Sequence, residues 1–331
     1  MSPTTLDFAT GKSLAPLVVH AAKYSTQLYP LFRSDIESAT TAILHYMIFK
    51  FMSGSALETL SEDMIQYTRQ MKALDRLITY KLGRTLLQVL LNLSGLDNEE
   101  SSTSMIGEAL PIEGHDEANN EPLLWAALIT FGGILQTFFG EHVAAADVMV
   151  KHGANCVTKI FVASPTGILD TYLKCVSCFA AARQTGSKKY TKVAKQLRST
   201  IKKWSKAGNP NVAPYECLVD AEMMALNGKI DKSVKLYQDA IRISARCGCQ
   251  HNAALACERL GDLYLTVCKN EEEACVRLGQ ARTYWLGWGA KAKVAQLDSM
   301  YSELPGPIGS FFLSRATNDS ARQLDISSKH F

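Results

Sequence analysis

The chain has 331 residues, a hydrophobic fraction of 47% and a formal net charge of +3. This apolar fraction is typical of a globular protein, and the length allows two ordinary domains or one extended helical array. The small positive excess argues against a general nucleic-acid binder. Nine cysteines, without a secretory leader at the start of the chain, favour reduced thiols in a cytoplasmic protein.

Residues 1–33 are expected to form an N-terminal segment with one short helix before Pro30. Thr10-Gly11-Lys12-Ser13 matches only the end of a phosphate loop, because Leu6 stands where the first glycine of that motif belongs. We therefore expect no nucleotide site there. The short helix would bury five apolar residues: Leu17, Val18, Ala21, Tyr24 and Leu28.

Residues 34–95 are predicted to form helical hairpins. Ser34 and Asp35 can cap a helix that runs to about Met52. The next two helices, up to Leu74 and then from about Asp75 to Leu93, should pack antiparallel on each other. The first of them has a single apolar stripe with steps of three and four residues: Leu57, Leu60, Met64, Tyr67, Met71 and Leu74.

Residues 96–121 change the character of the chain. They include eight acidic residues and no Lys or Arg, and Pro111 and Gly114 interrupt any periodicity. This composition predicts a long, mobile acidic loop between helix pairs. A docking element for a basic surface is the alternative.

Residues 122–304 are predicted to be tetratricopeptide-like helical repeats. Their first helix, near 123–140, is apolar but contains polar residues and falls short of the roughly 20 apolar residues that span a bilayer, so a buried helix is favoured over a membrane span. A helix from about Val143 to Lys151 should follow. Another should begin at Ser164-Pro165-Thr166 and end before Gly186.

Two cysteine motifs raise the question of a metal site. Cys175-x-x-Cys178 lies inside a predicted helix, and Cys247-x-Cys249-x-His251 lies at a turn between helices. Tetrahedral zinc needs four ligands, and neither motif has a second pair at suitable spacing. Buried apolar thiols are therefore the favoured interpretation, and the sequence indicates no metal or other cofactor.

The helix from Ser187 to Lys206 has the most unusual chemistry of the chain. Its apolar face carries Tyr190, Val193, Leu197, Ile201 and Trp204, and no carboxylate lies within the helix. A basic amphipathic helix of this kind can bind an acidic protein or an anionic membrane surface, although it can also be a repeat helix with a basic wet face. Its eight cations form the candidate face for an anionic partner: Lys188, Lys189, Lys192, Lys195, Arg198, Lys202, Lys203 and Lys206.

One pattern occurs twice between Tyr237 and Tyr301. Tyr237-x-x-Ala240 is followed by Gly248, and Leu278-x-x-Ala281 is followed by Gly289, each 41 residues after its counterpart. The bulky residue and the alanine share one helix face, and the glycine ends the helix. Such units must stack on neighbours, so the sequence predicts an all-α fold, an α-solenoid of antiparallel helix pairs with a period near 41 residues.

Several residues are expected to make the contacts within and between these repeats. Leu260-Gly261-x-x-Tyr264 matches the tetratricopeptide pattern, and Glu222 and Glu258 could accept hydrogen bonds from a neighbouring helix or from Lys293. We assign the two carboxylates a structural role because no base, nucleophile or metal ligand accompanies them. The repeat-packing residues are Tyr237, Ala240, Gly248, Leu260, Gly261, Tyr264, Ala274, Leu278, Ala281, Trp288 and Gly289.

A set of short motifs between Ile43 and Tyr301 carries a family resemblance. The most specific is Trp288-Gly289-Ala290-x-x-Lys293-Val294-x-x-Leu297-x-x-x-Tyr301. The other matching positions are Gly54, Leu57, the segment 88–95, Asn211, Leu218, Ala221-Glu222, Gly228, Tyr237-x-x-Ala240-Ile241 and Ala254-Leu255-Ala256-x-Glu258. Over most of Ile43 to Tyr301 the chain resembles the helical-repeat region of large multi-sensor hybrid signalling kinases. Pro214-Tyr215 and Ser302 depart from that family's pattern.

In that family the repeat region shares a chain with a serine/threonine-kinase-like domain, an AAA-type ATPase, a GAF sensor and a histidine kinase. The resemblance implies that residues 305–331 are a tail or a linker toward a sensor domain. No kinase catalytic loop, complete phosphate loop or histidine-kinase motif occurs in this chain. We therefore expect a protein that is not an enzyme.

The sequence thus predicts a non-catalytic scaffold for protein–protein interaction in signal transduction. The alternatives are a regulatory fragment of a multi-domain AAA-type ATPase or histidine kinase, and a peripheral binder of anionic surfaces through the basic helix. The expected partners are proteins, including kinase or ATPase domains, and neither nucleic acid nor a small-molecule substrate is indicated.

Overall fold

The computed structural model describes residues 36–97, 102–110, 121–153, 156–161, 165–209, 212–302 and 304. Within these ranges the chain forms twelve α-helices and no β-strand, so the predicted all-α class is confirmed. The predicted helix at residues 17–28, the Thr10-Gly11-Lys12-Ser13 segment and the tail at residues 305–331 lie outside the described residues.

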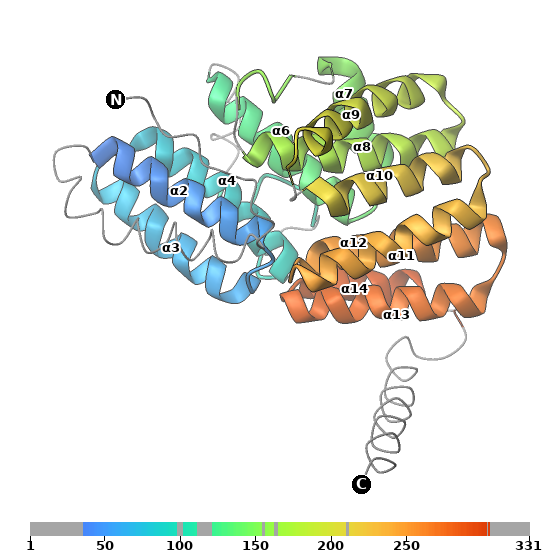
Figure 1. Cartoon of the computed structure of the whole chain (residues 1–331). Helices are drawn as coiled ribbons and strands as arrows, with labels where there is room; N and C mark the ends of the chain where they lie inside the picture. The colour runs from blue at the N-terminus through green and yellow to red at the C-terminus, as the bar shows by residue number, and fades with distance from the viewer. Residues whose placement is uncertain are drawn as a thin grey trace, which may run out of the picture.

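The N-terminal helices are α2 (Ile36–Met52), α3 (Leu57–Ala73) and α4 (Leu77–Ser94), and they lie together at one side of the molecule (Figure 1). The apolar stripe predicted for α3 is buried from Leu57 to Met71, with each stripe residue at 2% exposure or less. Leu74 is 36% exposed, because α3 ends one residue earlier. α3 and α4 pack on each other along their length.

Residues 102–110 of the predicted acidic loop pack on α4 through two amide side chains. Gln88 Oε1 accepts hydrogen bonds from the backbone N–H groups of Ala109 and Leu110, both at 3.0 Å. Asn92 Nδ2 donates to the carbonyl of Ser104 at 2.6 Å. This part of residues 96–121 is anchored, whereas the sequence predicted a mobile loop throughout. The acidic composition did not indicate the anchor, because both amides belong to α4.

The middle of the chain forms α6 (Pro122–Phe138), α7 (His142–His152), α8 (Pro165–Thr185) and α9 (Lys188–Lys206). Most apolar residues of α6 are buried in the core, as predicted, and Leu135 has no exposed surface, whereas Leu123, Trp125, Leu128 and Ile129 are partly buried. α8 packs against both α7 and α9, and α9 also contacts α7 and α10 (Figure 1). None of the described helices is both long enough and apolar enough to cross a membrane.

The C-terminal helices are α10 (Ala213–Leu226), α11 (Ile230–Arg246), α12 (Gln250–Leu263), α13 (Glu271–Trp288) and α14 (Lys291–Met300). α10 pairs with α11, and α12 pairs with α13. A π-helical turn, η2 (Tyr264–Cys268), continues α12. Gly248 and Gly289 have φ values of 76° and 96°, so they end α11 and α13 in the left-handed conformation, as predicted.

The repeat-packing residues predicted from the sequence lie largely in the core. A Cβ atom at Gly261 would come within 2.8 Å of Leu278 Cγ, so the glycine allows α13 to approach α12 closely. Tyr264 is only partly buried, because it begins the π-helical turn. The 41-residue period and the solenoid arrangement stay predictions. The repeat-packing residues with 1% exposure or less are Tyr237, Ala240, Leu260, Ala274, Leu278, Ala281 and Trp288.

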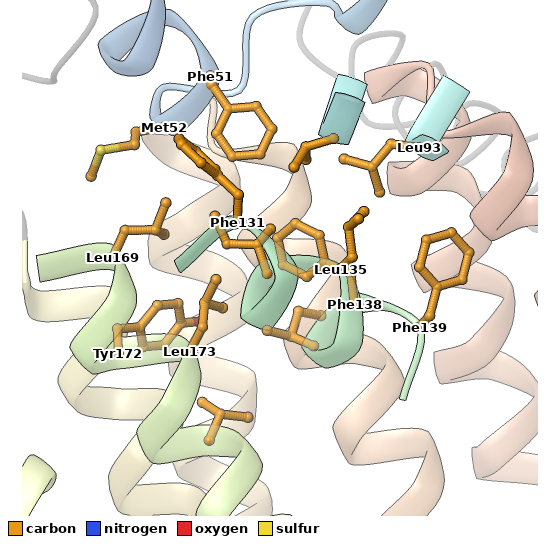
Figure 2. Packing of buried hydrophobic residues seen from close by; sticks show 14 of the residues in the cluster. Phe51, Met52, Leu93, Phe131, Leu135, Phe138, Phe139, Leu169, Tyr172 and Leu173 are labelled. Atoms are coloured by element: carbon orange, nitrogen blue, oxygen red, sulfur yellow. The ribbon is translucent and has the colours of Figure 1, made fainter. Parts of the chain in front are cut away.

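One cluster of buried apolar side chains runs from α2 to α14. Figure 2 shows Phe51 and Met52 of α2 together with Phe131 and Phe138 of α6 in this cluster. Trp288 at the end of α13 donates from Nε1 to the carbonyl of Ser55 at 3.0 Å. The turn after α2 and the end of α13 are therefore in direct contact.

Candidate functional site

The exposed face of α9 carries five lysines in one line, which we call the lysine row: Lys188, Lys192, Lys195, Lys203 and Lys206. At 100° per residue, these five positions fall within an arc of about 80° of the helix surface. At 1.5 Å per residue, the row is about 27 Å long. The opposite side of α9 is anchored in the core by Tyr190, Ala194, Leu197 and Ile201.

Both edges of the lysine row are bordered by ion pairs to neighbouring helices. On one edge, Lys189 Nζ lies 3.0 Å from Asp147 Oδ1 of α7. On the other edge, Arg198 pairs with Asp220 of α10, and Lys202 Nζ lies 3.1 Å from the same carboxylate. The tertiary structure therefore supplies carboxylates that the helix itself lacks. Of the eight predicted cations, three are paired with carboxylates of the described residues, and we narrow the candidate face to the five lysines of the row.

The ion pair of Lys189 and Asp147 also includes the hydroxyl of Tyr190. Tyr190 Oη donates to Asp147 Oδ1 at 2.7 Å. This hydrogen bond, with the one from Lys189, lowers the pKa of Asp147, and the same carboxylate raises the pKa of Lys189. Both groups are therefore held in their charged forms at this edge of the row.

The lysine row opposes the stability of α9 at its N-terminal end, whereas Lys203 and Lys206 lie in the last turn, where the helix dipole favours positive charge. The first turn of α9 contains no acidic residue, and Lys188 lies where the helix dipole favours negative charge. Lys188 and Lys192, like Lys203 and Lys206, are like charges at helical neighbour spacing, which costs about 0.2–0.5 kcal/mol per pair. A charge arrangement that opposes local stability is typical of residues that serve binding.

Glu222 and Glu258 have the structural role that the sequence predicted. Glu222 is fully buried and accepts a hydrogen bond from Arg259 Nε at 2.6 Å. Glu258 accepts from Lys293 Nζ at 2.7 Å and from Trp285 Nε1 at 3.2 Å. Burial alone would raise the pKa of Glu222, but the charges of Arg259 and Arg183 outweigh it and hold that pKa below its ordinary value.

His142 joins this buried network, although no sequence pattern indicated it. Arg259 Nη1 lies 3.2 Å from His142 Nε2, and Ser177 Oγ lies 3.2 Å from His142 Nδ1. Because an arginine can only donate, Nε2 accepts and the ring is neutral. Burial, followed by the charge of Arg259, lowers the pKa of His142 well below its ordinary value. The contact joins α12 to the consecutive helices α7 and α8, and Arg259 lies 117 residues after His142 in sequence.

In the described part of the chain, none of the nine cysteines forms a disulfide. Cys175 and Cys178 are fully buried in α8, in agreement with the interpretation as apolar thiols. Cys249 is buried and Cys247 is partly exposed. Among the residues that the structure describes, no three His, Cys, Asp or Glu side chains are grouped so that they could hold a metal ion.

A cavity of about 370 Å³ lies between α2, α4 and α6, away from α9. Its walls are mostly apolar, with His45 and Thr41 among the polar residues that line it. His45 Nδ1 is 2.9 Å from the carbonyl of Thr41. Sequence patterns could not indicate this cavity, because its lining comes from segments more than 100 residues apart.

Comparison of the chain with protein-family models, with curated proteins and with solved structures gave no match.

Proposed function

We propose that this protein is a non-catalytic helical-repeat scaffold for protein–protein interaction in signal transduction, acting in the cytoplasm. The tetratricopeptide-like solenoid remains part of this proposal, and the consecutive helix pairs with glycine-ended helices support it. The observation that carries the proposal is the lysine row on α9. It is the face that we assign to the partner.

Electrostatics supports a binding role for the row. Five exposed lysines on a rigid helix create a positive potential that attracts an acidic partner and increases its association rate. The side chains project from a helix whose other face is buried in the core, so the backbone positions that carry the charges are fixed before binding. This arrangement reduces the entropy that is lost when a partner binds.

A photo-crosslinker at Ser199 tests the proposal, because Ser199 is exposed and lies on the line of the row. We expect discrete adducts in source cells that disappear in the triple variant Lys188→Glu, Lys192→Glu, Lys195→Glu. Circular dichroism and a melting curve establish that this variant folds. Absence of adducts, or adducts that the triple variant leaves unchanged, would contradict the proposal.

The matched control changes three exposed lysines at the N-cap and in the first turns of α11: Lys229→Glu, Lys232→Glu and Lys235→Glu. It alters the net charge by the same amount as the triple variant on α9. We therefore expect the control to retain the Ser199 adducts. Loss of the adducts in both variants would mean that net charge, rather than the row, governs the interaction.

A second candidate is a regulatory fragment of a larger AAA-type ATPase or histidine kinase. The resemblance of residues 43–301 to the repeat region of hybrid signalling kinases favours it. An antibody raised against the α9 segment would reveal the mass of the native polypeptide. A band near the 36.3 kDa of this chain supports the free-standing scaffold, and a band several times larger supports the fragment.

A further inference from the structure

We propose that the lysine row binds one acidic α-helix, lying along α9, of a partner protein. This inference rests on the proposed function and specifies the partner's chemistry. The row is long and narrow, since it extends about 27 Å along α9 but occupies an arc of only about 80°. A single helix presents charges over a surface of similar shape.

The width of the positive surface is limited by the neighbouring carboxylates. The angles are measured around the helix axis from the centre line of the row. Lys189 lies about 80° to one side of this line, and Lys202 and Arg198 lie about 60–100° to the other side. These three cations form ion pairs with Asp147 of α7 and Asp220 of α10. A partner that spreads over α7 or α10 would meet these carboxylates. A ligand one helix wide avoids them.

The spacing of the lysines matches the repeat of an α-helix. The second, third, fourth and fifth lysines lie 4, 7, 15 and 18 residues after Lys188. Carboxylates at the same intervals on a partner helix also fall on one face and have the same axial separations. Ser199 lies between Lys195 and Lys203 on the line of the row. Because its side chain is uncharged, the partner helix needs no carboxylate at the position that faces Ser199.

The surface of α9 fits a protein better than a lipid membrane. Peripheral membrane helices combine their basic residues with exposed large apolar side chains that enter the bilayer. The exposed large apolar residues of the described chain lie on other elements, and Val193 and Trp204 of α9 pack against the core. A planar anionic surface would also approach Asp147 and Asp220, which flank the row.

Synthetic helices test the inference directly. The aligned peptide has about 20 residues in a helix-favouring background, with glutamates at positions 1, 5, 8, 16 and 19. The scrambled peptide has the same composition, with its glutamates distributed around the helix. Fluorescence anisotropy at low ionic strength is expected to show about tenfold tighter binding of the aligned peptide, and salt should weaken it.

Variants assign the binding to the row. Lys188→Gln, Lys192→Gln and Lys195→Gln together should weaken binding of the aligned peptide about tenfold, whereas Lys229→Gln, Lys232→Gln and Lys235→Gln together should leave it unchanged. Equal binding of the two peptides would overturn the inference. Tighter binding to phosphatidylserine vesicles than to the aligned peptide would overturn it in favour of a lipid surface.

The two proposals fail in different ways. If Ser199 gives row-dependent adducts in cells but the aligned peptide does not bind, the scaffold proposal stands and the helical partner is wrong. If Ser199 gives no adducts and no anionic probe binds, the lysine row is not an interaction surface at all.

Discussion

Lys293 of α14 is fully buried, and its ammonium group lies 2.7 Å from the carboxylate of Glu258 on α12. Gln296 accepts a second hydrogen bond from the same ammonium group at 2.7 Å. Burial lowers the pKa of Lys293 below its ordinary value, although Glu258 opposes that shift. The pair joins the last described helix to the helix two before it in the chain.

Replacing Glu258 by Gln should destabilise the protein by about 3 kcal/mol, because it leaves a buried ammonium without a counter-charge. The folded-state pKa of Lys293 would fall further below its unfolded value. The unfolded state would then bind more protons, so the stability of the variant should rise as the pH increases from about 7 to 10. Urea unfolding across this range measures both effects.

Glu62→Gln is the control for that prediction, because Glu62 is exposed on α3. It should change the free energy of unfolding by less than about 0.5 kcal/mol. Unchanged stability of Glu258→Gln would show that the Glu258–Lys293 pair does not support the fold.

His251 should make the protein sensitive to mild acid. Its ring is fully buried, 4.8 Å from the ring of Trp288, and burial lowers its pKa to about 3. An unfolded histidine titrates near pH 6.5. Above that pH both states hold the neutral ring, so His251 does not lower the free energy of unfolding there. The free energy of unfolding should fall by about 1.4 kcal/mol per pH unit between pH 6.5 and about 3, because only the unfolded state gains the proton.

His251→Phe keeps an aromatic ring beside Phe51 and Trp288 but cannot take up a proton. The loss of stability between about pH 7.5 and pH 5.5 should therefore be smaller in the variant by about 1.4 kcal/mol. Denaturant midpoints at the two pH values give this difference, which does not depend on how well phenylalanine fits. An identical pH dependence in both proteins would refute the assignment.

Gly261→Ala should cost about 2 kcal/mol, because the new Cβ would meet Leu278 Cγ at 2.8 Å. The cost should shrink in a Leu278→Ala background, where the clash is removed. A double-mutant cycle measures this coupling. Gly133→Ala is the matched control within α6: its Cβ would have only ordinary contact, at 3.6 Å from Lys174 Cε, and it should gain about 0.5–1 kcal/mol. Additive effects at Gly261 and Leu278 would contradict the close approach of α12 and α13.

Charge reversal at the two ends of the lysine row should have opposite effects on stability. Lys188 is the first residue of α9 and Lys206 the last. Lys188→Glu should stabilise the fold by about 0.5 kcal/mol, and Lys206→Glu should destabilise it by a similar amount, because the helix dipole favours anions only at the N-terminus. Thermal unfolding of the two variants tests this, and shifts of the same sign would show that the dipole does not govern the row.

Thiol titration should separate two classes of cysteine. Burial raises the pKa of Cys178 and of Cys257 to about 12, so these thiols should not react with a disulfide reagent in the folded protein. Cys175 and Cys249 are also buried and should behave in the same way. Five further thiols are partly exposed and should react first. Added zinc should protect none of them, and rapid reaction of all nine would contradict the burial.

Periodicity made the helices predictable, because a stripe of apolar residues depends only on local spacing. The α3 stripe, the buried α6, and the glycine ends of α11 and α13 were all recognisable in this way. The partners of these helices were harder to predict. Ser55 and Trp288 are 233 residues apart in sequence, and no local pattern brings them together.

The sequence alone determined the all-α class, the basic character of α9 and the structural roles of Glu222 and Glu258, since each follows from residue type and helical spacing. Only the tertiary structure decided which cations of α9 form ion pairs, because their partners Asp147 and Asp220 belong to α7 and α10. It also decided that residues 102–110 pack on Gln88 and that His142 joins Arg259. Ion pairs and buried hydrogen bonds depend on distances between separate helices, and helical periodicity does not encode those distances.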